Sequence, residues 1–115
     1  MYRMVIVNIK AYMRRFFMTE IWLDIVGYEG MYQVSNLGRV KSVKFDKERI
    51  LKQRLSLNHF PMVSLSKNSR VTTFTVQYLV MKHFFPARNG RHTVKHFNGD
   101  KSDNRVVNLG YVVEV

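Results

Sequence analysis

Apolar and polar residues alternate in two neighbouring stretches, and this alternation predicts a pair of β-strands. Residues 62–66 (MVSLS) and 72–76 (TTFTV) alternate apolar and polar side chains, which is the period of a strand with one buried face. Residues 67–70 (KNSR) join the two stretches and suit a hairpin turn. Pro61 fits the start or edge of a strand, because proline cannot donate a ladder hydrogen bond. We therefore expect residues 50–76 to form a small antiparallel sheet.

A second strand pair is predicted closer to the N-terminus. Residues 32–35 and 39–43 favour short strands, and the SNLG sequence between them contains asparagine and glycine, which tolerate the positive φ of a tight turn. Aromatic and aliphatic residues surround these strands. We expect the core of this unit to contain Trp22, Ile25, Tyr28 and Tyr32.

The hydrophobic period changes to that of a helix over residues 76–85. Apolar side chains recur there at i, i+3 and i+4 spacing, and Pro86 marks the end because the residue before a proline disfavours helix. Residues 93–97 then favour a strand, and Asn98-Gly99 is the preferred pair for a type I′ hairpin turn. Small antiparallel sheets with one short helix indicate an α+β fold.

Composition narrows the class of partner. A length of 115 residues suits one domain, or one domain with a small appended module. The absence of cysteine excludes disulfides, thiolate zinc sites and a cysteine nucleophile. The net charge of +11 predicts a polyanionic partner, with DNA or RNA first and an anionic membrane surface second. A basic soluble protein without such a partner is the remaining alternative.

Residues 1–17 differ from the rest of the chain because they carry basic residues and no acid. Their apolar run is short, is broken by Asn8 and precedes no small-residue cleavage site, so neither a signal peptide nor a membrane span is predicted. A basic amphipathic helix on a membrane surface is the competing interpretation. We expect residues 1–17 to be a leader that need not belong to the native protein, in which case Met18 is its first residue. Its basic residues are Arg3, Lys10, Arg14 and Arg15.

Two stretches resemble parts of a known protein family. Residues 20–42 (EIWLDIVGYEGMYQVSNLGRVKS) are similar to the nuclease-associated modular domain that precedes many phage and intron-encoded HNH homing endonucleases. Residues 74–109, which end in VKHFNGDKSDNRVVNL, resemble the HNH nuclease core that follows it. The resemblance divides the chain into the leader at 1–17, the module at 18–45 and a nuclease-like domain at 46–115.

The resemblance implies a ββα-metal fold in which a hairpin and a helix hold one divalent cation, Mg²⁺ or a similar ion, against a DNA phosphate. His96 stands at the position of the general base, whose pKa class suits proton transfer near neutral pH. Asn108 stands at the central asparagine, and Asn104 and Arg105 match the polar approach to it. The implied protein is a monomer without a membrane partner that cuts or nicks double-stranded DNA in the cytoplasm of a phage-infected or bacterial cell.

The chain departs from the family pattern at several positions. Lys95 precedes His96 where the family places an oxygen ligand, and an ammonium group has no lone pair and repels a cation. The family often has a further ligand on a helix beyond Asn108, and we expect that helix to be missing or truncated. Gln77-Tyr78 and Gly110 also replace residues typical of the family. These departures predict weak or absent turnover.

Asp100 and Asp103 are the remaining candidates for metal ligands, because hard cations bind carboxylate oxygens. Turns also favour aspartate for backbone reasons alone. The alternative to an endonuclease is therefore a DNA-binding remnant or regulator without activity. His59, His83 and His92 have no partner at metal-ligand spacing, and we interpret them as structural or solvated residues.

DNA contact is predicted from the basic segment 39–54 and from the turn of the second hairpin. Alternation along a strand places Arg39 and Lys41 on one face, where they neutralise phosphates. The predicted DNA-binding residues are Tyr32, Ser35, Asn36, Arg39, Lys41, Lys67, Arg70, Lys95 and Arg105.

Overall fold

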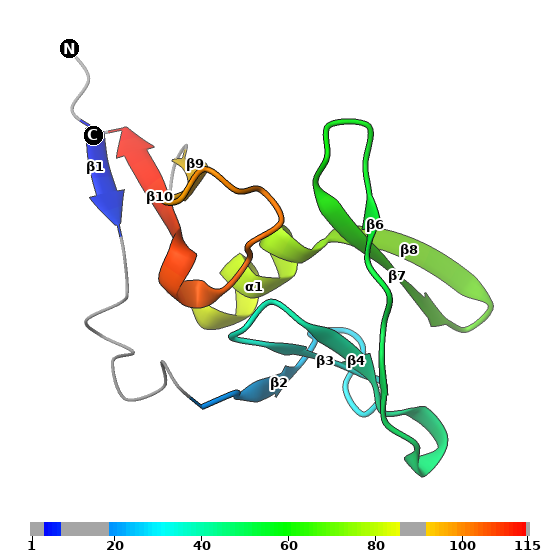
Figure 1. The fold of residues 1–115 in the computed structure, drawn as a ribbon. Helices are drawn as coiled ribbons and strands as arrows, with labels where there is room; N and C mark the ends of the chain where they lie inside the picture. The colour runs from blue at the N-terminus through cyan, green and yellow to red at the C-terminus, as the bar shows by residue number, and fades with distance from the viewer. Residues whose placement is uncertain (1–3, 8–18, 86–91, 115) are drawn as a thin grey trace.

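The computed structural model describes residues 4–7, 19–85 and 92–114. Within them the chain forms three antiparallel sheets and one α-helix, so the expected α+β class is confirmed (Figure 1). The strands are β1 (Met4–Val7), β2 (Trp22–Asp24), β3 (Tyr32–Ser35), β4 (Val40–Ser42), β5 (Arg49–Ile50), β6 (Arg54–Leu55), β7 (Pro61–Lys67), β8 (Arg70–Thr75), β9 (His92–His96) and β10 (Leu109–Glu114), with helix α1 (Val76–Phe84) and 3-10 turns η2 (Lys44–Asp46) and η3 (Val106–Asn108).

The first sheet has the strand order β2-β3-β4-β5. The two strands expected on either side of the SNLG turn are β3 and β4. Ser35 closes this turn, since its carbonyl oxygen accepts from the Gly38 amide at 3.0 Å and its hydroxyl accepts from the amides of Leu37 and Arg39. Gly38 has a φ of 79°, a conformation that glycine adopts without steric cost.

The second sheet has the order β6-β7-β8 and contains the predicted hairpin. Asn68 and Ser69 have φ values of 52° and 61°, so both central residues have the positive φ that a type I′ turn requires. Pro61 is the first residue of β7, as expected. The expected sheet over residues 50–76 needs one correction, because Ile50 lies in β5 and pairs with Lys41 of the first sheet.

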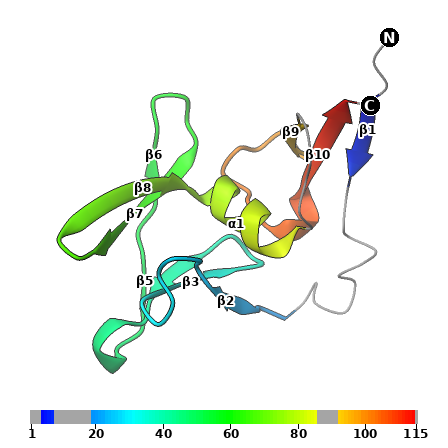
Figure 2. The same cartoon turned by 180° about the vertical axis from the view of Figure 1, so that it is seen from behind.

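Helix α1 lies where the helical period predicted it. The hydroxyl of Thr75 caps its start by accepting from the Tyr78 amide at 3.2 Å. Phe85 has an extended backbone and precedes proline, which ends the helix. The two views of the fold show α1 between the three sheets (Figure 2).

The third sheet has the order β1-β10-β9. A long loop, residues 97–108, joins β9 to β10, so the type I′ hairpin expected at Asn98-Gly99 is wrong. The two residues do form a local turn, in which the Gly99 amide donates to the His96 carbonyl at 3.0 Å. Gly99 has a positive φ of 77° but Asn98 does not, which excludes type I′.

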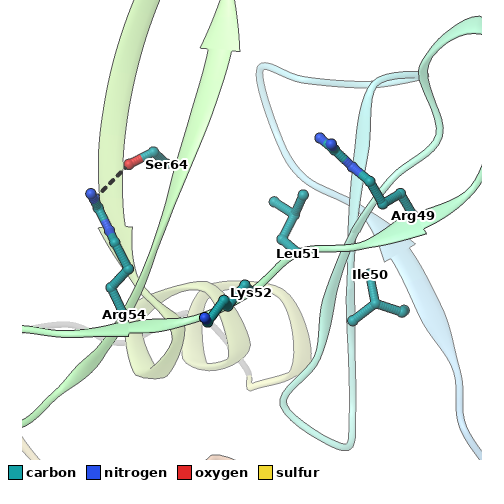
Figure 3. Close-up of a pocket in the computed structure, with 6 residues that line it drawn as sticks. All are labelled: Arg49, Ile50, Leu51, Lys52, Arg54 and Ser64. Atoms are coloured by element: carbon teal, nitrogen blue, oxygen red, sulfur yellow. Dashed lines mark hydrogen bonds between the residues drawn. The ribbon is translucent and has the colours of Figure 1, made fainter.

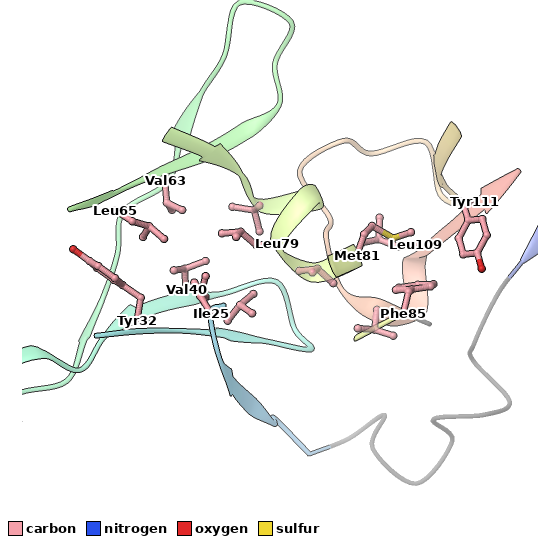
Figure 4. Close-up of a cluster of buried hydrophobic side chains, with 14 residues drawn as sticks. Ile25, Tyr32, Val40, Val63, Leu65, Leu79, Met81, Phe85, Leu109 and Tyr111 are labelled. Atoms are coloured by element: carbon pink, nitrogen blue, oxygen red, sulfur yellow. The ribbon is translucent and has the colours of Figure 1, made fainter. Parts of the chain in front are cut away.

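One continuous apolar core joins the sheets through α1. Leu79, Val80 and Met81 of the helix are at most 1% exposed and belong to a cluster with residues of all three sheets (Figure 4). Ile25 and Tyr32 belong to this core, and Tyr28 packs against it, as expected. The core contains Ile25, Tyr32, Val34, Val40, Val63, Leu65, Val76, Leu79, Val80, Met81, Phe85, Val106, Leu109 and Tyr111.

Trp22 does not belong to this core, contrary to the expectation. Its ring is half-buried at the surface, with the ammonium of Lys41 4.3 Å and the guanidinium of Arg39 5.5 Å from the ring centroid. The indole therefore forms cation–π contacts with two charged side chains. In the described part of the chain, no helix is long and apolar enough to cross a bilayer.

Candidate active site and nucleic-acid interface

Asn108 holds the 97–108 loop in a fixed shape. Its side-chain oxygen accepts from the Asn98 amide at 3.0 Å, and its side-chain nitrogen donates to the Asn98 side chain at 2.9 Å and to the Asp103 carbonyl at 2.8 Å. The residue is only 5% exposed, so these bonds satisfy an amide that is shielded from water. Asn108 thus connects the start, the middle and the end of the loop.

His96 and Asn104 contact each other at the base of this loop. The Nε2 atom of His96 lies 2.8 Å from the side-chain oxygen of Asn104. An amide oxygen can only accept a hydrogen bond, so Nε2 carries the proton and the neutral ring keeps its lone pair on Nδ1. The His96 ring is half-buried and Asn104 is 3% exposed. The pair therefore presents one oriented base, the arrangement that general-base chemistry requires.

The SNLG turn of the first sheet supports the same loop from behind. A Cβ atom on Gly38 would lie 2.9 Å from the backbone carbon of Asn104, so only glycine allows this close approach. The carbonyl oxygen of Asn36 accepts from the Val106 amide at 2.8 Å. The Asn36 side chain accepts from the Ile21 amide at 2.6 Å. The N-terminal segment and the loop with Asn104 are therefore joined through one turn.

The two loop aspartates are engaged by neighbouring groups. Hydrogen bonds from the Ser102 hydroxyl and amide lower the pKa of Asp100. Hydrogen bonds from the Arg105 guanidinium, above all, lower the pKa of Asp103, whose two oxygens both accept from Arg105. Asp103 also accepts from the Asn98 side chain at 2.8 Å. Both carboxylates act as fixed acceptors within the loop.

This donor set does not fit a divalent cation as it is arranged. Within the described residues no three His, Asp or Glu side chains come together in a group that could hold a metal ion. Both oxygens of Asp103 are occupied by Arg105, and the side-chain oxygen of Asn104 is occupied by His96. Lys95, next to His96, is exposed and offers an ammonium group in place of an oxygen ligand.

Several residues predicted to contact DNA are instead turned into the protein. Tyr32, Ser35 and Asn36 are 5% exposed or less, and the Tyr32 hydroxyl lies 3.2 Å from the Ser66 hydroxyl. Arg39 forms an ion pair with Glu20. These side chains stabilise the first sheet and its contacts.

Lys41 is also engaged within the protein, since it is 8% exposed and forms an ion pair with Glu48 at 3.0 Å. Arg39 and Lys41 do share a face, because both lie over Trp22. Lys41 is buried on that face, whereas the side chain of Arg39 pairs with Glu20 and remains 48% exposed. Lys67 donates to the Gly27 carbonyl at 2.6 Å. Arg70 is exposed on β8.

The other three histidines belong to elements outside the 97–108 loop. His83 connects α1 to the first sheet, since its Nε2 accepts from the Val26 amide at 3.0 Å and its Nδ1 lies 2.7 Å from the Leu79 carbonyl. His59 is exposed in the β6–β7 loop with a φ of 65°. His92 begins β9.

Three basic residues that the sequence pattern did not single out, Arg49, Lys52 and Arg54, line a hollow between the first and second sheets (Figure 3). These three residues lie in the basic segment 39–54, but strand alternation favoured Arg39 and Lys41 at its start as the DNA contacts. The ion pairs of those two residues with acids far along the chain or across a turn were not visible in the pattern.

Comparison with known proteins bears out the resemblance. The NUMOD4 motif matches residues 20–66. DNA endonuclease I-HmuI of Bacillus phage SP01 is 39% identical over 93 residues, which cover 81% of this chain and 52% of that protein. Uncharacterized HNH endonuclease L247 of Acanthamoeba polyphaga mimivirus is 36% identical over 98 residues, which cover 82% of this chain and 24% of that protein.

A solved structure, described as DNA binding and cleavage by the HNH homing endonuclease I-HmuI, has the same fold. It matches with a TM-score of 0.69 and 38% identity over 77% of this chain and 50% of that chain. The chain therefore spans about half the length of I-HmuI and about a quarter of the mimivirus protein. The motif, the two relatives and the common fold together show that this chain carries a NUMOD4 motif and is similar to the first half of an HNH homing endonuclease.

Proposed function

We propose that this protein hydrolyses phosphodiester bonds in double-stranded DNA, with His96 as the general base. The observation that carries the proposal is the hydrogen bond between His96 and Asn104, in which Nε2–H donates to the amide oxygen, so that the neutral tautomer has its lone pair on Nδ1. The similarity to a relative named as a DNA endonuclease supports the choice of substrate.

In this reaction, Nδ1 of His96 takes a proton from a water molecule and the resulting hydroxide attacks the phosphorus atom. The P–O bond to one sugar oxygen breaks, and this oxygen leaves and takes a proton from solvent to become a hydroxyl group. Asn104 keeps the ring in the tautomer with the proton on Nε2, and its hydrogen bond persists when the ring becomes an imidazolium. Asn108 keeps the loop closed so that His96 and the loop residues face one phosphate. Lys95 and Arg105 are exposed beside this site and supply positive charge for the phosphate oxygens.

The family resemblance implies Mg²⁺ or a similar divalent cation, which would offset the charge that develops on the phosphate. The described side chains do not form a site for such an ion in this arrangement, because their oxygens are engaged by Arg105 and His96. We therefore assign no step of the reaction to a metal. Protein side chains hold the phosphate, orient the base and move the proton.

A second candidate function is DNA binding without cleavage. It is favoured by the exposed ammonium of Lys95 beside His96, and by Arg105 occupying both oxygens of Asp103. Lys95 adds positive charge near the phosphate, and the Arg105–Asp103 ion pair withholds carboxylate oxygens from a cation. A protein of this kind would bind DNA without a metal and release no product.

The protein's setting is part of the proposal. The similarity to a Bacillus phage endonuclease supports action in the cytoplasm of a phage-infected or bacterial cell, where the DNA substrate lies. We expect the chain to act as a monomer on double-stranded DNA, and sedimentation of the DNA complex would measure the ratio of protein to DNA.

A plasmid nicking assay separates the two functions. Supercoiled plasmid is incubated with Mg²⁺ or Mn²⁺ and either the unaltered chain or His96→Ala, with a chelator as a further control. Relaxed product that disappears in His96→Ala supports the endonuclease. A salt-sensitive gel shift without product from either protein would identify the non-cleaving DNA-binding protein instead.

A further inference from the structure

Strand β1 pairs the beginning of the chain with the last described strand. Residues 4–7 run antiparallel to β10, and the two strands lie side by side in both views of the fold (Figure 1, Figure 2). The NUMOD4 match begins at residue 20, so β1 lies outside the part of the chain that this motif describes. The register of the pairing is Met4↔Glu114, Val5↔Val113, Ile6↔Val112 and Val7↔Tyr111.

β1 supplies the third strand of the sheet that carries His96. The strand order is β1-β10-β9, so β10 is the central strand and has a partner on each side. Among the described residues, β10 is the only strand paired with β9, which ends at His96. A two-stranded hairpin is marginally stable in water, and a third strand adds to its stability. β1 therefore stabilises the strand on which the position of β9 depends.

The register connects β1 to the proposed base through β10. Tyr111 pairs with Val7 on one side and with Val94 on the other. Leu109, two residues before Tyr111, pairs with His96 and is fully buried in the apolar core. The core thus holds the end of β10 at Leu109, and β1 holds the end at residues 111–114. Both ends must be held for the strand to keep a fixed direction beside β9.

The backbone groups of β10 alternate between its two neighbours. In an antiparallel ladder a residue exchanges its N–H and C=O hydrogen bonds with one neighbouring strand, and the next residue exchanges them with the other. Displacement of β1 would therefore leave every second residue of the segment 111–114 with an open N–H and C=O, as on an edge strand. The residues between them would keep their bonds to β9.

We propose that residues 4–7 are a functional element of the nuclease portion, which holds β10 in place and thereby positions His96. This assignment differs from the leader that the composition of residues 1–17 indicated. His96 remains the catalytic residue, and β1 acts on it through β10 as a positioning element. The inference rests on the proposed function for its effect on cleavage, whereas its effect on β10 is measured without DNA.

Two neighbouring proline substitutions, Val5→Pro and Ile6→Pro, test the pairing without changing the charge of the chain. The two residues are consecutive in an edge strand, so the N–H of one donates to β10 and the N–H of the other points away from it. Proline is tolerated on an edge strand where the missing N–H faces outward. One variant should therefore lose the pairing with β10, and the other is its matched control.

Amide hydrogen exchange in the full chain, followed by NMR, is the first readout. Val112 and Val113 both pair with β1 and with β9, so one of their amides donates to β1 and the other to β9. In one proline variant, the amide that donates to β1 should exchange several-fold to about tenfold faster, the effect of one lost hydrogen bond, while the other stays protected. Unchanged exchange in both proline variants would overturn the inference.

The β7–β8 hairpin serves as the internal control for folding. It belongs to the second sheet, which β1 does not join, so its amides should exchange at the unaltered rate in every variant. Faster exchange in this hairpin as well as in β10 would mean that the proline affects the whole fold. That result would also overturn the specific role of β1 at β10.

The second readout is the rate of plasmid nicking at protein concentrations that saturate the DNA, together with DNA affinity by fluorescence anisotropy. A 1 Å misplacement of a reacting group lowers a rate by about 100-fold, so a looser β10 predicts a nicking rate lower by several-fold to about tenfold. DNA affinity should stay unchanged, because the substitution removes no charge. The matched proline variant should nick at the unaltered rate.

The two readouts separate this inference from the proposed cleavage. Faster exchange in β10 with an unaltered nicking rate would refute the positioning of His96 by β1. If the unaltered chain does not nick DNA, the proposed function fails, and hydrogen exchange alone decides whether β1 holds β10.

Discussion

Replacing Gly38 by alanine tests whether the SNLG turn positions the 97–108 loop, which contains Asn104. The new Cβ would lie 2.9 Å from the backbone carbon, 3.0 Å from the backbone oxygen and 3.2 Å from the Cβ of Asn104. These atoms are backbone or next to it, so they yield only if the loop moves by a few tenths of an ångström. Because Asn104 bonds to His96, the same displacement reaches the proposed base.

Gly30 supplies the matched control. It has a φ of 77°, against 79° for Gly38, and a Cβ there would meet no atom within 4 Å. Alanine in the left-handed region costs about 1–2 kcal/mol, and this strain applies to both variants. Overpacking adds about 1–3 kcal/mol at Gly38 alone. The free energy of unfolding, measured in urea, should therefore fall further in Gly38→Ala by that overpacking contribution.

The functional readout is plasmid nicking at a temperature where both variants are folded. A 1 Å misplacement of a reacting group lowers a rate by about 100-fold, so a shift of a few tenths of an ångström predicts a rate lower by several-fold to about tenfold. Gly30→Ala should nick at nearly the rate of the unaltered chain. Equal nicking rates for the two variants, compared at equal folded fraction, would refute the positioning role of Gly38.

Three further predictions concern the loop and the helix. Asn108→Ala leaves the Asn98 amide and the Asp103 carbonyl without their partner. The free energy of unfolding in urea should therefore fall by about 1–3 kcal/mol. A fall below about 0.5 kcal/mol would contradict the role of Asn108. Asp103 has a pKa below its usual value, so its contribution to stability is complete above the unfolded pKa of about 3.9 and is lost as pH falls through the folded pKa. Asp103→Asn should therefore weaken the decline of the melting temperature below about pH 4, and an unchanged decline would contradict this. Thr75→Ala removes the helix cap and should lower the free energy of unfolding by about 1 kcal/mol, while no change would show that the cap is not needed.

The sequence predicted those parts of the fold that depend on neighbouring residues. The β7–β8 hairpin and α1 follow from alternation, from turn residues and from the proline after Phe85, all of which act over a few positions. The 97–108 loop was missed because its shape depends on Asn108 bonding back to Asn98. A local preference of Asn-Gly for a type I′ turn carries no information about such a contact.

The hydrophobic pattern also could not predict the pairing of β1 with β10. Met4–Val7 lies within the segment interpreted as a leader, and its partner Tyr111–Glu114 is at the other end of the chain. Pairing between strands so far apart depends on tertiary structure. Alternation within either strand does not specify the partner.

The candidate site was predictable where a residue type carries the chemistry. His96 and Asn104 were named from the family resemblance, and the structure brings them into contact. The support from Gly38 was not predictable, because it arises from the approach of two segments that are distant in sequence. The ion pairs of Arg39 with Glu20 and of Lys41 with Glu48 were likewise not predictable from the sequence.

Chemical rescue of His96→Ala tests the central claim, that His96 acts as a base in DNA cleavage, most directly. The substitution removes a half-buried imidazole ring beside Asn104, and we expect imidazole from solution to take its place. We predict that His96→Ala fails to nick supercoiled plasmid and that added imidazole restores nicking in proportion to its concentration. Nicking by His96→Ala at the rate of the unaltered chain, without imidazole, would contradict the account.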